Sequence, residues 1–113
     1  MFKIAQSSDY FWPVTYSFPG DNGRTEKATF DAKFKRISQS RIDELKAQFA
    51  ADEFREIDLV KDVLVGWRGV TDADGQDIPF SISDRDRLLD VPMMAAQIGK
   101  AFLESLAGAQ RKN

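Results

Sequence analysis

The fold is decided by residues 12–34, which read WPVTYSFPGDNGRTEKATFDAKF. On both sides of the central Pro-Gly-Asp-Asn-Gly segment, apolar and polar side chains alternate with a period of two. This alternation is typical of strands with one buried and one wet face, and Pro-Gly and Asn-Gly favour turns. The sequence therefore predicts a β-hairpin with strands at about 12–18 and 25–36. Pro13 cannot donate to a strand ladder, so it should lie on an edge strand or at a strand start.

Two helices are predicted after the hairpin. Ser40 is interpreted as the N-cap of the first, whose apolar side chains fall at helical spacing: Ile42, Leu45 and Phe49. The second should cover about 52–64, with Asp52 as its cap. Its apolar stripe would comprise Phe54, Ile57, Val60 and Leu64.

Two further helices are predicted near the end of the chain. Ser83 should cap a short helix at about 84–90, and Pro92 should open a last helix that stops at Gly108. The last helix would bury one apolar face, formed by Ala95, Ile98, Phe102 and Leu106 and widened by Met94 and Leu103.

Residues 64–81, LVGWRGVTDADGQDIPFS, are interpreted as a structural corner between helical regions. Short extended pieces are expected at 67–71 and 77–81, with a turn between them. Trp67 should pack over the core while its flanking glycines let the backbone bend. The residues assigned to the corner are Gly66, Trp67, Gly69, Gly75, Pro79 and Phe80.

The acidic turn inside this corner also invites a calcium interpretation. Counted from Asp72, however, Gly75 falls at position 4 and Ser83 at position 12, whereas an EF-hand loop requires Gly at position 6 and Glu at position 12. A tight turn between short strands explains the same residues. The acids at 52–58 and 84–90 are interpreted as solvated helix faces rather than paired catalytic carboxylates.

The predicted fold class is α+β, with an N-terminal β-hairpin or small antiparallel sheet followed by mostly helical structure. The chain is expected to form one domain over residues 1–113. Within it, the β-hairpin region is 1–37 and the helical region is 38–108, with the extended corner at 66–81. Residues 109–113 are expected to fray.

Composition limits the classes of function. The chain carries 16 basic and 18 acidic residues, a net charge of −2, which argues against non-specific nucleic-acid binding. It has no His and no Cys, which excludes Ser-His and Cys-His hydrolases and thiolate zinc sites. No catalytic residue, metal ligand or cofactor is predicted. The lack of a long apolar run and of a signal-peptide pattern predicts no membrane partner and a cytosolic location.

Two groups of residues are predicted to contact a partner. Tyr10, Phe11 and Trp12 are adjacent aromatics, and successive side chains of a strand face opposite ways. At least one of them should therefore be exposed or covered by a partner, where it would serve self-association or client binding. Met93 and Met94 are also candidates, because methionine suits adaptable surfaces, although a place in the core is the favoured interpretation for them.

Several segments, in their order along the chain, resemble the tail assembly chaperones of long-tailed bacteriophages and prophages. The resemblance covers nearly the whole chain through short motifs. These are Phe11–Val14, Thr29–Ile37, Val63–Val70, Asp72–Gly75, Pro79–Ser81, Leu88–Pro92 and Arg111–Asn113.

The resemblance implies a non-enzymatic protein that binds the tape measure protein, with the tail tube protein as a further partner. It also implies self-association, a place in the cytoplasm of the bacterial host and absence from the mature virion. The terminal Lys112-Asn113 is compatible with a longer, frameshifted form. The alternatives are a small structural subunit retained in the particle, for tail completion or head–tail joining, and a small enzyme or metal-binding module.

Overall fold

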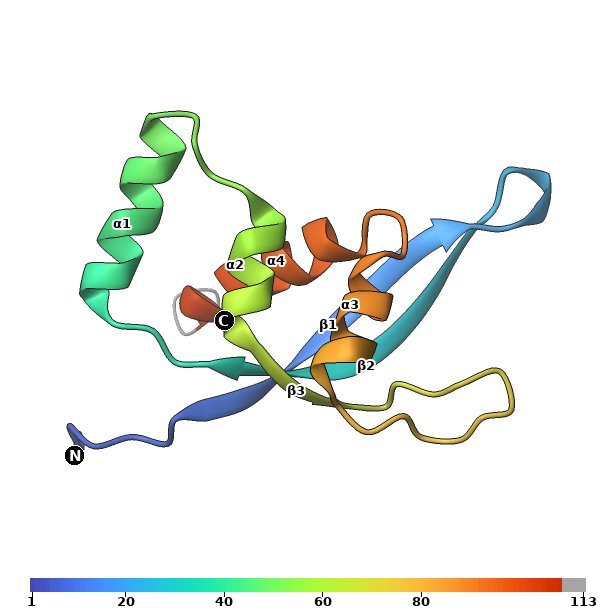
Figure 1. Cartoon of the computed structure of the whole chain (residues 1–113), viewed down its shortest axis with the longest axis horizontal. Coiled ribbons are helices and arrows are strands. Elements are labelled where there is room, and N and C mark those ends of the chain that lie inside the picture. The colour runs from blue at the N-terminus through green and yellow to red at the C-terminus, as the bar shows by residue number, and fades with distance from the viewer. Residues whose placement is uncertain (109–113) are drawn as a thin grey trace.

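A computed structural model describes residues 1–108; the predicted fray at 109–113 lies outside the described residues. The strands and helices follow in the order β1 (Asp9–Pro19), β2 (Thr25–Lys35), α1 (Gln39–Ala50), α2 (Glu56–Val63), β3 (Leu64–Arg68), α3 (Ile82–Leu89) and α4 (Met94–Leu106), with a short 3-10 turn, η1 (Asp21–Gly23), between β1 and β2. The chain is therefore a mixed α+β protein in which strands and helices are interleaved (Figure 1).

The predicted hairpin is confirmed. Strands β1 and β2 pair antiparallel, with Val14 opposite Phe30, and Figure 1 shows their far end extending beyond the helices. The turn places Asn22 and Gly23 at φ values of 60° and 75°. Asn and Gly tolerate this left-handed region best, so the Asn-Gly pair allows the chain to reverse there.

The third strand was predicted too far along the chain. Instead of an extended piece at 67–71, β3 covers Leu64–Arg68 and follows α2 without a loop. It pairs antiparallel with β2, with Trp67 opposite Ala32, and the register shifts between Lys33 and Phe34. The run Val63-Leu64-Val65 favours extended structure, and its pairing with β2 overrides the helical spacing that placed Leu64 in the preceding helix.

Pro13 lies on an edge strand, as predicted, because the strand order is β1-β2-β3. At Ser17 the edge is closed by Gln97 of α4: its Oε1 accepts from the Ser17 N–H at 2.9 Å, and its Nε2 donates to the Ser17 carbonyl at 3.1 Å. Pro13 lies four residues before Ser17, so its nitrogen faces the same outer side and no sheet hydrogen bond is lost.

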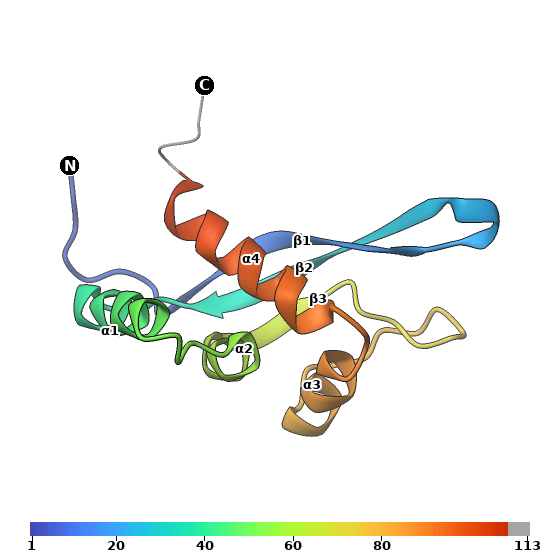
Figure 2. The same ribbon diagram turned by 90° about the horizontal axis from the view of Figure 1, so that it is seen from above.

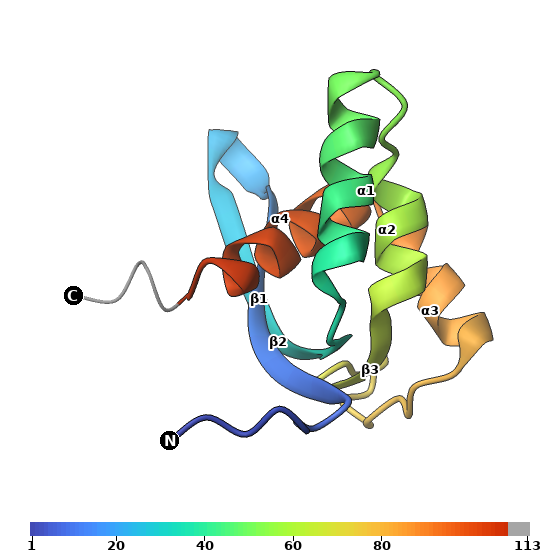
Figure 3. The same cartoon turned by 90° about the vertical axis from the view of Figure 1, so that its left-hand side faces the viewer.

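Helix α4 lies across one face of the sheet, and α2 packs against α4 (Figures 2 and 3). The ring of Phe102 meets the ring of Phe34 edge-on, with 5.1 Å between centroids. The buried apolar side chains of the described residues form one cluster. It comprises Val14, Phe30, Ala32, Phe34, Leu45, Leu59, Val60, Val63, Leu64, Trp67, Leu89, Met94, Ile98, Ala101 and Phe102.

Two predicted serine caps were wrong by two residues. Ser38, not Ser40, accepts from the Arg41 N–H at 3.1 Å and begins α1. Ser81, not Ser83, accepts from the Asp84 N–H at 3.0 Å and begins α3. In each case a second serine follows two residues later. The earlier one has the extended backbone that an N-cap needs.

The predicted starts of the other two helices were also wrong. Asp52 is not a cap: it lies in the turn after α1 at a φ of 57°, and α2 begins only at Glu56. Pro92 does not open α4, which begins at Met94 after Met93 takes a left-handed φ of 65°. Both positive φ values reverse the chain in short connections, and propensity alone does not reveal such reversals.

The corner around Trp67 is present. Trp67 is 9% exposed, and its indole N–H donates to the Ile78 carbonyl at 2.7 Å. Its ring meets Phe80 edge-on at 4.9 Å. Gly69 and Gly75 have φ values of 86° and 78°, which mark the two bends of the corner.

The remaining corner residues have simpler places. Gly66 is buried, and a Cβ there would stand 3.1 Å from the Cβ of Lys33 on the neighbouring strand. Pro79 is exposed. The contacts of Trp67 with Ile78 and Phe80 hold the loop before α3 against the end of β3.

We predict that Trp67→Ala lowers the free energy of unfolding by about 3–5 kcal/mol, because it empties a buried site and removes the hydrogen bond to Ile78. Urea unfolding followed by circular dichroism measures the loss. Val65→Ala is the matched control: Val65 lies on the same strand but is 39% exposed. Its cost should be about 1 kcal/mol or less, and equal costs for the two variants would contradict the assigned role of Trp67.

Candidate partner-binding groove

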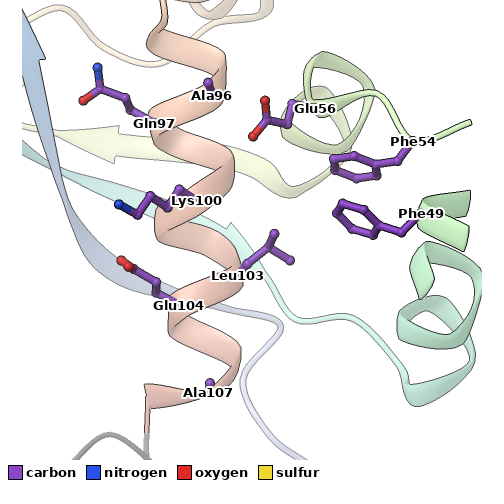
Figure 4. Close-up of a pocket in the computed structure, with 9 residues that line it drawn as sticks. All are labelled: Phe49, Phe54, Glu56, Ala96, Gln97, Lys100, Leu103, Glu104 and Ala107. Atoms are coloured by element: carbon purple, nitrogen blue, oxygen red, sulfur yellow. The ribbon is translucent and has the colours of Figure 1, made fainter. Parts of the chain in front are cut away.

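A concave surface forms a groove between α4 and the turn that joins α1 to α2 (Figure 4). Its volume is about 800 Å³, and it is open to solvent along its length. A cavity of this size lies within the range of about 300–1,000 Å³ that is typical of ligand sites. We call it the α1–α4 groove. Its lining comprises Phe49, Phe54, Glu56, Ala96, Gln97, Lys100, Leu103, Glu104 and Ala107.

One wall of the groove is a pair of stacked phenylalanines. The rings of Phe49 and Phe54 lie 4.0 Å apart between centroids and are inclined by 18° (Figure 4). Phe49 is 51% exposed, and Phe54 is half-buried. The stack joins the last turn of α1 to the segment before α2, so it holds the connection between the two helices while leaving one ring face open to solvent.

The opposite wall is one stripe of α4. Ala96, Lys100, Leu103 and Ala107 recur at spacings of four, three and four, which places them on one side of the helix. Figure 4 shows Leu103 facing the two phenylalanine rings, with Glu56 beside Ala96. The charged ends of Lys100 and Glu104 point away from the rings. The middle of the groove is therefore apolar, and Glu56 is the charged side chain at its phenylalanine side.

Helix α1 is held to the body mainly at its first half. Leu45 is its one buried residue. Asp62 of α2 ties the same region together: its Oδ1 accepts from Lys35 Nζ at 2.7 Å, and its Oδ2 lies 3.5 Å from Arg41 Nε. The hydrogen bond from Lys35, with the positive charges of Lys35 and Arg41, holds the pKa of the Asp62 carboxyl below its usual value, against the opposing effect of burial.

Sequence reasoning missed the groove. Phe49 and Phe54 were assigned to the apolar stripes of two separate helices, and both were expected to face the core. Phe54 does pack against the core while half-buried, but Phe49 is mainly exposed, and the two rings stack on each other at the rim. A signal was present in the sequence: the two aromatics flank Ala51-Asp52-Glu53, where the helical pattern breaks.

The adjacent aromatics Tyr10, Phe11 and Trp12 point to opposite faces of the sheet, as the alternation predicts. Tyr10 and Trp12 face α4: the Tyr10 ring meets Phe34, and its hydroxyl lies 2.6 Å from Ser105 Oγ. Trp12 is half-buried, and a Cβ at Gly108 would stand 2.9 Å from its ring. Tyr10 and Trp12 therefore hold the end of α4 onto the sheet.

Phe11 faces the other side of the sheet and is 39% exposed. The guanidinium carbon of Arg68 lies 3.9 Å from the centre of its ring, and Lys33 Nζ lies 5.6 Å from it. These are cation–π distances. Of the three aromatics, Phe11 is the one whose position suits contact with a partner.

The two methionines differ in exposure. Met93 is 68% exposed, whereas Met94 is 5% exposed and belongs to the core. The favoured place in the core is therefore confirmed for Met94, which is too buried to contact a partner, and is wrong for Met93, which remains a candidate for partner contact. Met94 begins α4 with its side chain packed inward, because the left-handed backbone at Met93 turns the chain there.

The acidic turn at 72–77 is a backbone-capping turn. Asp72 Oδ1 accepts from the N–H groups of Asp74 and Gln76 at 2.8 and 3.0 Å. Within residues 1–108 there is no group of three or more His, Cys, Asp or Glu side chains placed to hold a metal ion. None of the helices in the described part of the chain is long and apolar enough to cross a bilayer.

We predict that Asp62→Asn lowers the free energy of unfolding by about 1 kcal/mol or less near neutral pH, because the ion pairs are partly exposed. Because the pKa of Asp62 is lowered in the folded state, its ion pairs stabilise the fold fully at pH values above the ordinary pKa of 3.8. This stabilisation is lost as the pH falls through the lowered pKa. The difference between wild type and variant should therefore shrink towards zero in acid. Urea unfolding over a pH series measures it, with the exposed Asp90→Asn as control. A difference that grows in acid would contradict the assignment.

We predict that Phe11→Ser changes the free energy of unfolding by about 1 kcal/mol or less, since its ring is exposed and its cation–π contacts are weak. Trp12→Ser should cost at least about 2 kcal/mol, because its ring supports α4. Phe11→Ser should also weaken binding of a client protein in a pull-down assay, whereas Thr15→Ala, on the same sheet face, should not. A large loss of stability in Phe11→Ser would place Phe11 in the core.

Comparisons with models of known families, with curated proteins and with solved structures each found no match.

Proposed function

We propose that the chain is a non-enzymatic tail assembly chaperone of a long-tailed bacteriophage or prophage, and that it binds the tape measure protein. The observation that carries this proposal is the α1–α4 groove, whose apolar middle is formed by Phe49, Phe54 and Leu103. The resemblance of the sequence to this class of chaperones supplies the identity of the client. The tail tube protein is a second partner in the same proposal.

The groove suits a client that is helical and amphipathic. An amphipathic helix presents apolar side chains at i, i+3, i+4 and i+7, and a hydrophobic groove is a common way to bind such a stripe. The Phe49–Phe54 stack offers a flat aromatic surface opposite Leu103. A client helix lying between them would cover apolar surface on both partners.

The same physics explains why such a client would need a chaperone. A long helical protein that awaits assembly exposes apolar stripes to water, and large exposed apolar patches promote aggregation. A small partner that covers one segment at a time keeps the client in solution without any chemical step. Release then requires only that the assembled tail bind the same stripe more tightly.

We predict that co-expression with the tape measure protein encoded beside its gene keeps that client soluble and that the two co-elute on a sizing column. Phe49→Ser should abolish co-elution because it opens the aromatic wall. Ile82→Ser is the matched control, since Ile82 is 59% exposed but lies on α3, outside the groove.

A client that is soluble alone and elutes separately from this chain would contradict the proposal. Detection of the chain in purified virions would instead favour a structural subunit that stays in the particle.

A further inference from the structure

The segment that precedes β1 starts at one end of the α1–α4 groove. A second cavity, of about 470 Å³, adjoins the groove there: Leu106 lines this cavity, and Ala107 lines the groove. Gln6 lines the same second cavity as Leu106. Leu106 follows Leu103 by three residues, so the two side chains lie on one side of α4. The chain just before β1 therefore lies where it can enter the groove along α4.

This segment carries two large apolar side chains that are exposed to water. Residues 1–6, which we call the leading arm, are all exposed. Phe2 is 74% exposed and Ile4 is 93% exposed. They are two residues apart, so in an extended chain their side chains point the same way. Figures 2 and 3 show the arm in an open position, running away from the sheet and the helices. Any position that covers both side chains with apolar surface is favoured over this one by the hydrophobic effect.

The arm is long enough to cover the apolar middle of the groove of its own molecule. An extended chain advances about 3.3–3.6 Å per residue, so Ile4 can lie about 7 Å from Gln6, and Phe2 about 13 Å from it. Along α4, Leu103 lies about 4.5 Å before Leu106. Ile4 can therefore contact Leu103 while Phe2 reaches the stacked phenylalanines, which Leu103 faces (Figure 4).

The charges of the arm and of the groove are complementary. Lys3 is the one charged residue of the arm. Glu56, Lys100 and Glu104 line the groove, two acids and one lysine. Residues 52–58, which carry part of the phenylalanine wall, have four acids and one arginine. In an extended arm Lys3 points opposite to the two apolar side chains, so it lies at this acidic rim when they point into the groove.

The covalent link decides which molecule's arm occupies the groove. A segment joined to its site by a short flexible linker is present there at an effective concentration of about a millimolar. The arm of a second copy is present only at the concentration of the protein itself. At micromolar protein, the groove's own arm therefore has an advantage of about a thousandfold.

We propose that the leading arm closes over the α1–α4 groove of its own molecule and has to leave before a client helix can bind. Phe2 packs against the stacked phenylalanines, Ile4 packs against Leu103, and Lys3 lies at the acidic rim. The arm thus takes the place of the client's apolar stripe, and it lowers the affinity for every client. The closed position involves only this chain, whereas its effect on a client rests on the proposed function.

The first test locates the arm in solution without a client. The chain has no cysteine, so a nitroxide label attaches only at an introduced one, Ala51→Cys, an exposed position beside the phenylalanine stack. This label should broaden the amide NMR signals of residues 2–4, because the closed arm brings them next to it. The double substitution Phe2→Ser with Ile4→Ser should abolish the broadening. The same label on Ile82→Cys, exposed on α3 and far from the arm in Figure 2, should leave the signals sharp.

Three results of this test would overturn the proposal. Sharp signals with the label at position 51 would show that the arm stays open. Equal broadening by the labels at positions 51 and 82 would show random contact. In a mixture of nitroxide-free, isotope-enriched chain with labelled chain, broadening of the enriched chain would show that the arm enters a second copy instead.

The second test measures the effect of the arm on affinity for the tape measure protein, with this client immobilised on a sensor surface. Phe2→Ser with Ile4→Ser should raise the affinity at least about threefold, because a site that is closed for about two-thirds of the time binds its ligand threefold more weakly. Ile82→Ser should leave the affinity unchanged. An arm variant that binds no more tightly than wild type would overturn the inhibitory role. A client that binds neither chain would contradict the proposed function, and the position of the arm is then decided by the NMR test alone.

Discussion

The rest of the structure depends on the packing of α4 across the inner face of the β1–β2 hairpin. Phe102 and Ile98 of α4 are fully buried, and so are Val14 and Phe34 of the hairpin. A hairpin alone is marginally stable in water, and it needs an apolar partner for its buried face. Once α4 fills that role, α2 packs against α4, and β3 continues from α2 onto the sheet. Helix α4 is therefore in contact with both the hairpin and α2.

The groove exists because α4 buries only one side against the sheet. The side with Phe102 faces the sheet, so the side with Leu103 remains for another partner. Helix α1 covers this side of α4 only in part. Leu45 is the one buried residue of α1, and the ion pair of α1 with Asp62 of α2 lies near the start of α1. The far end of α1 is thus the less firmly held wall. Few buried contacts mean a low free energy of local opening, so the groove can change its width at small cost.

The sequence predicted best where one rule decides the outcome. Period-two alternation identified the hairpin and required one of three adjacent aromatics to face outward, which is Phe11. The missing N–H of Pro13 limited it to an edge strand or a strand start, and it lies on the edge strand β1. Helix starts were less predictable. Ser38 and Ser40 both suit an N-cap, and so do Ser81 and Ser83, and only the backbone of the folded chain selects between them. The strand β3 was misplaced because its pairing with β2 is a long-range contact that no local pattern records.

The sequence marks the break between Phe49 and Phe54, but periodicity alone does not show that a groove forms there. Phe49 continues the same helical stripe as the buried Leu45, and periodicity gives both residues the same assignment. One turn of helix carries Phe49 beyond the edge of the core, where Phe54 meets it after a break in the helix. How far a helix extends past the surface that it packs on is a property of the whole fold. For that reason a residue that reads as core can become the wall of a binding surface.

The two hydrogen bonds between Gln97 and Ser17 have a consequence for local motion. An amide on the outer side of an edge strand ordinarily exchanges its proton with water readily, since no neighbouring strand shields it. Here the Ser17 amide is shielded by a side chain from α4, 80 residues away in the sequence. Its exchange rate therefore follows the docking of α4 rather than the pairing of β1 with β2. A single backbone proton at the rim of the sheet thus reports on the helix that holds the molecule together.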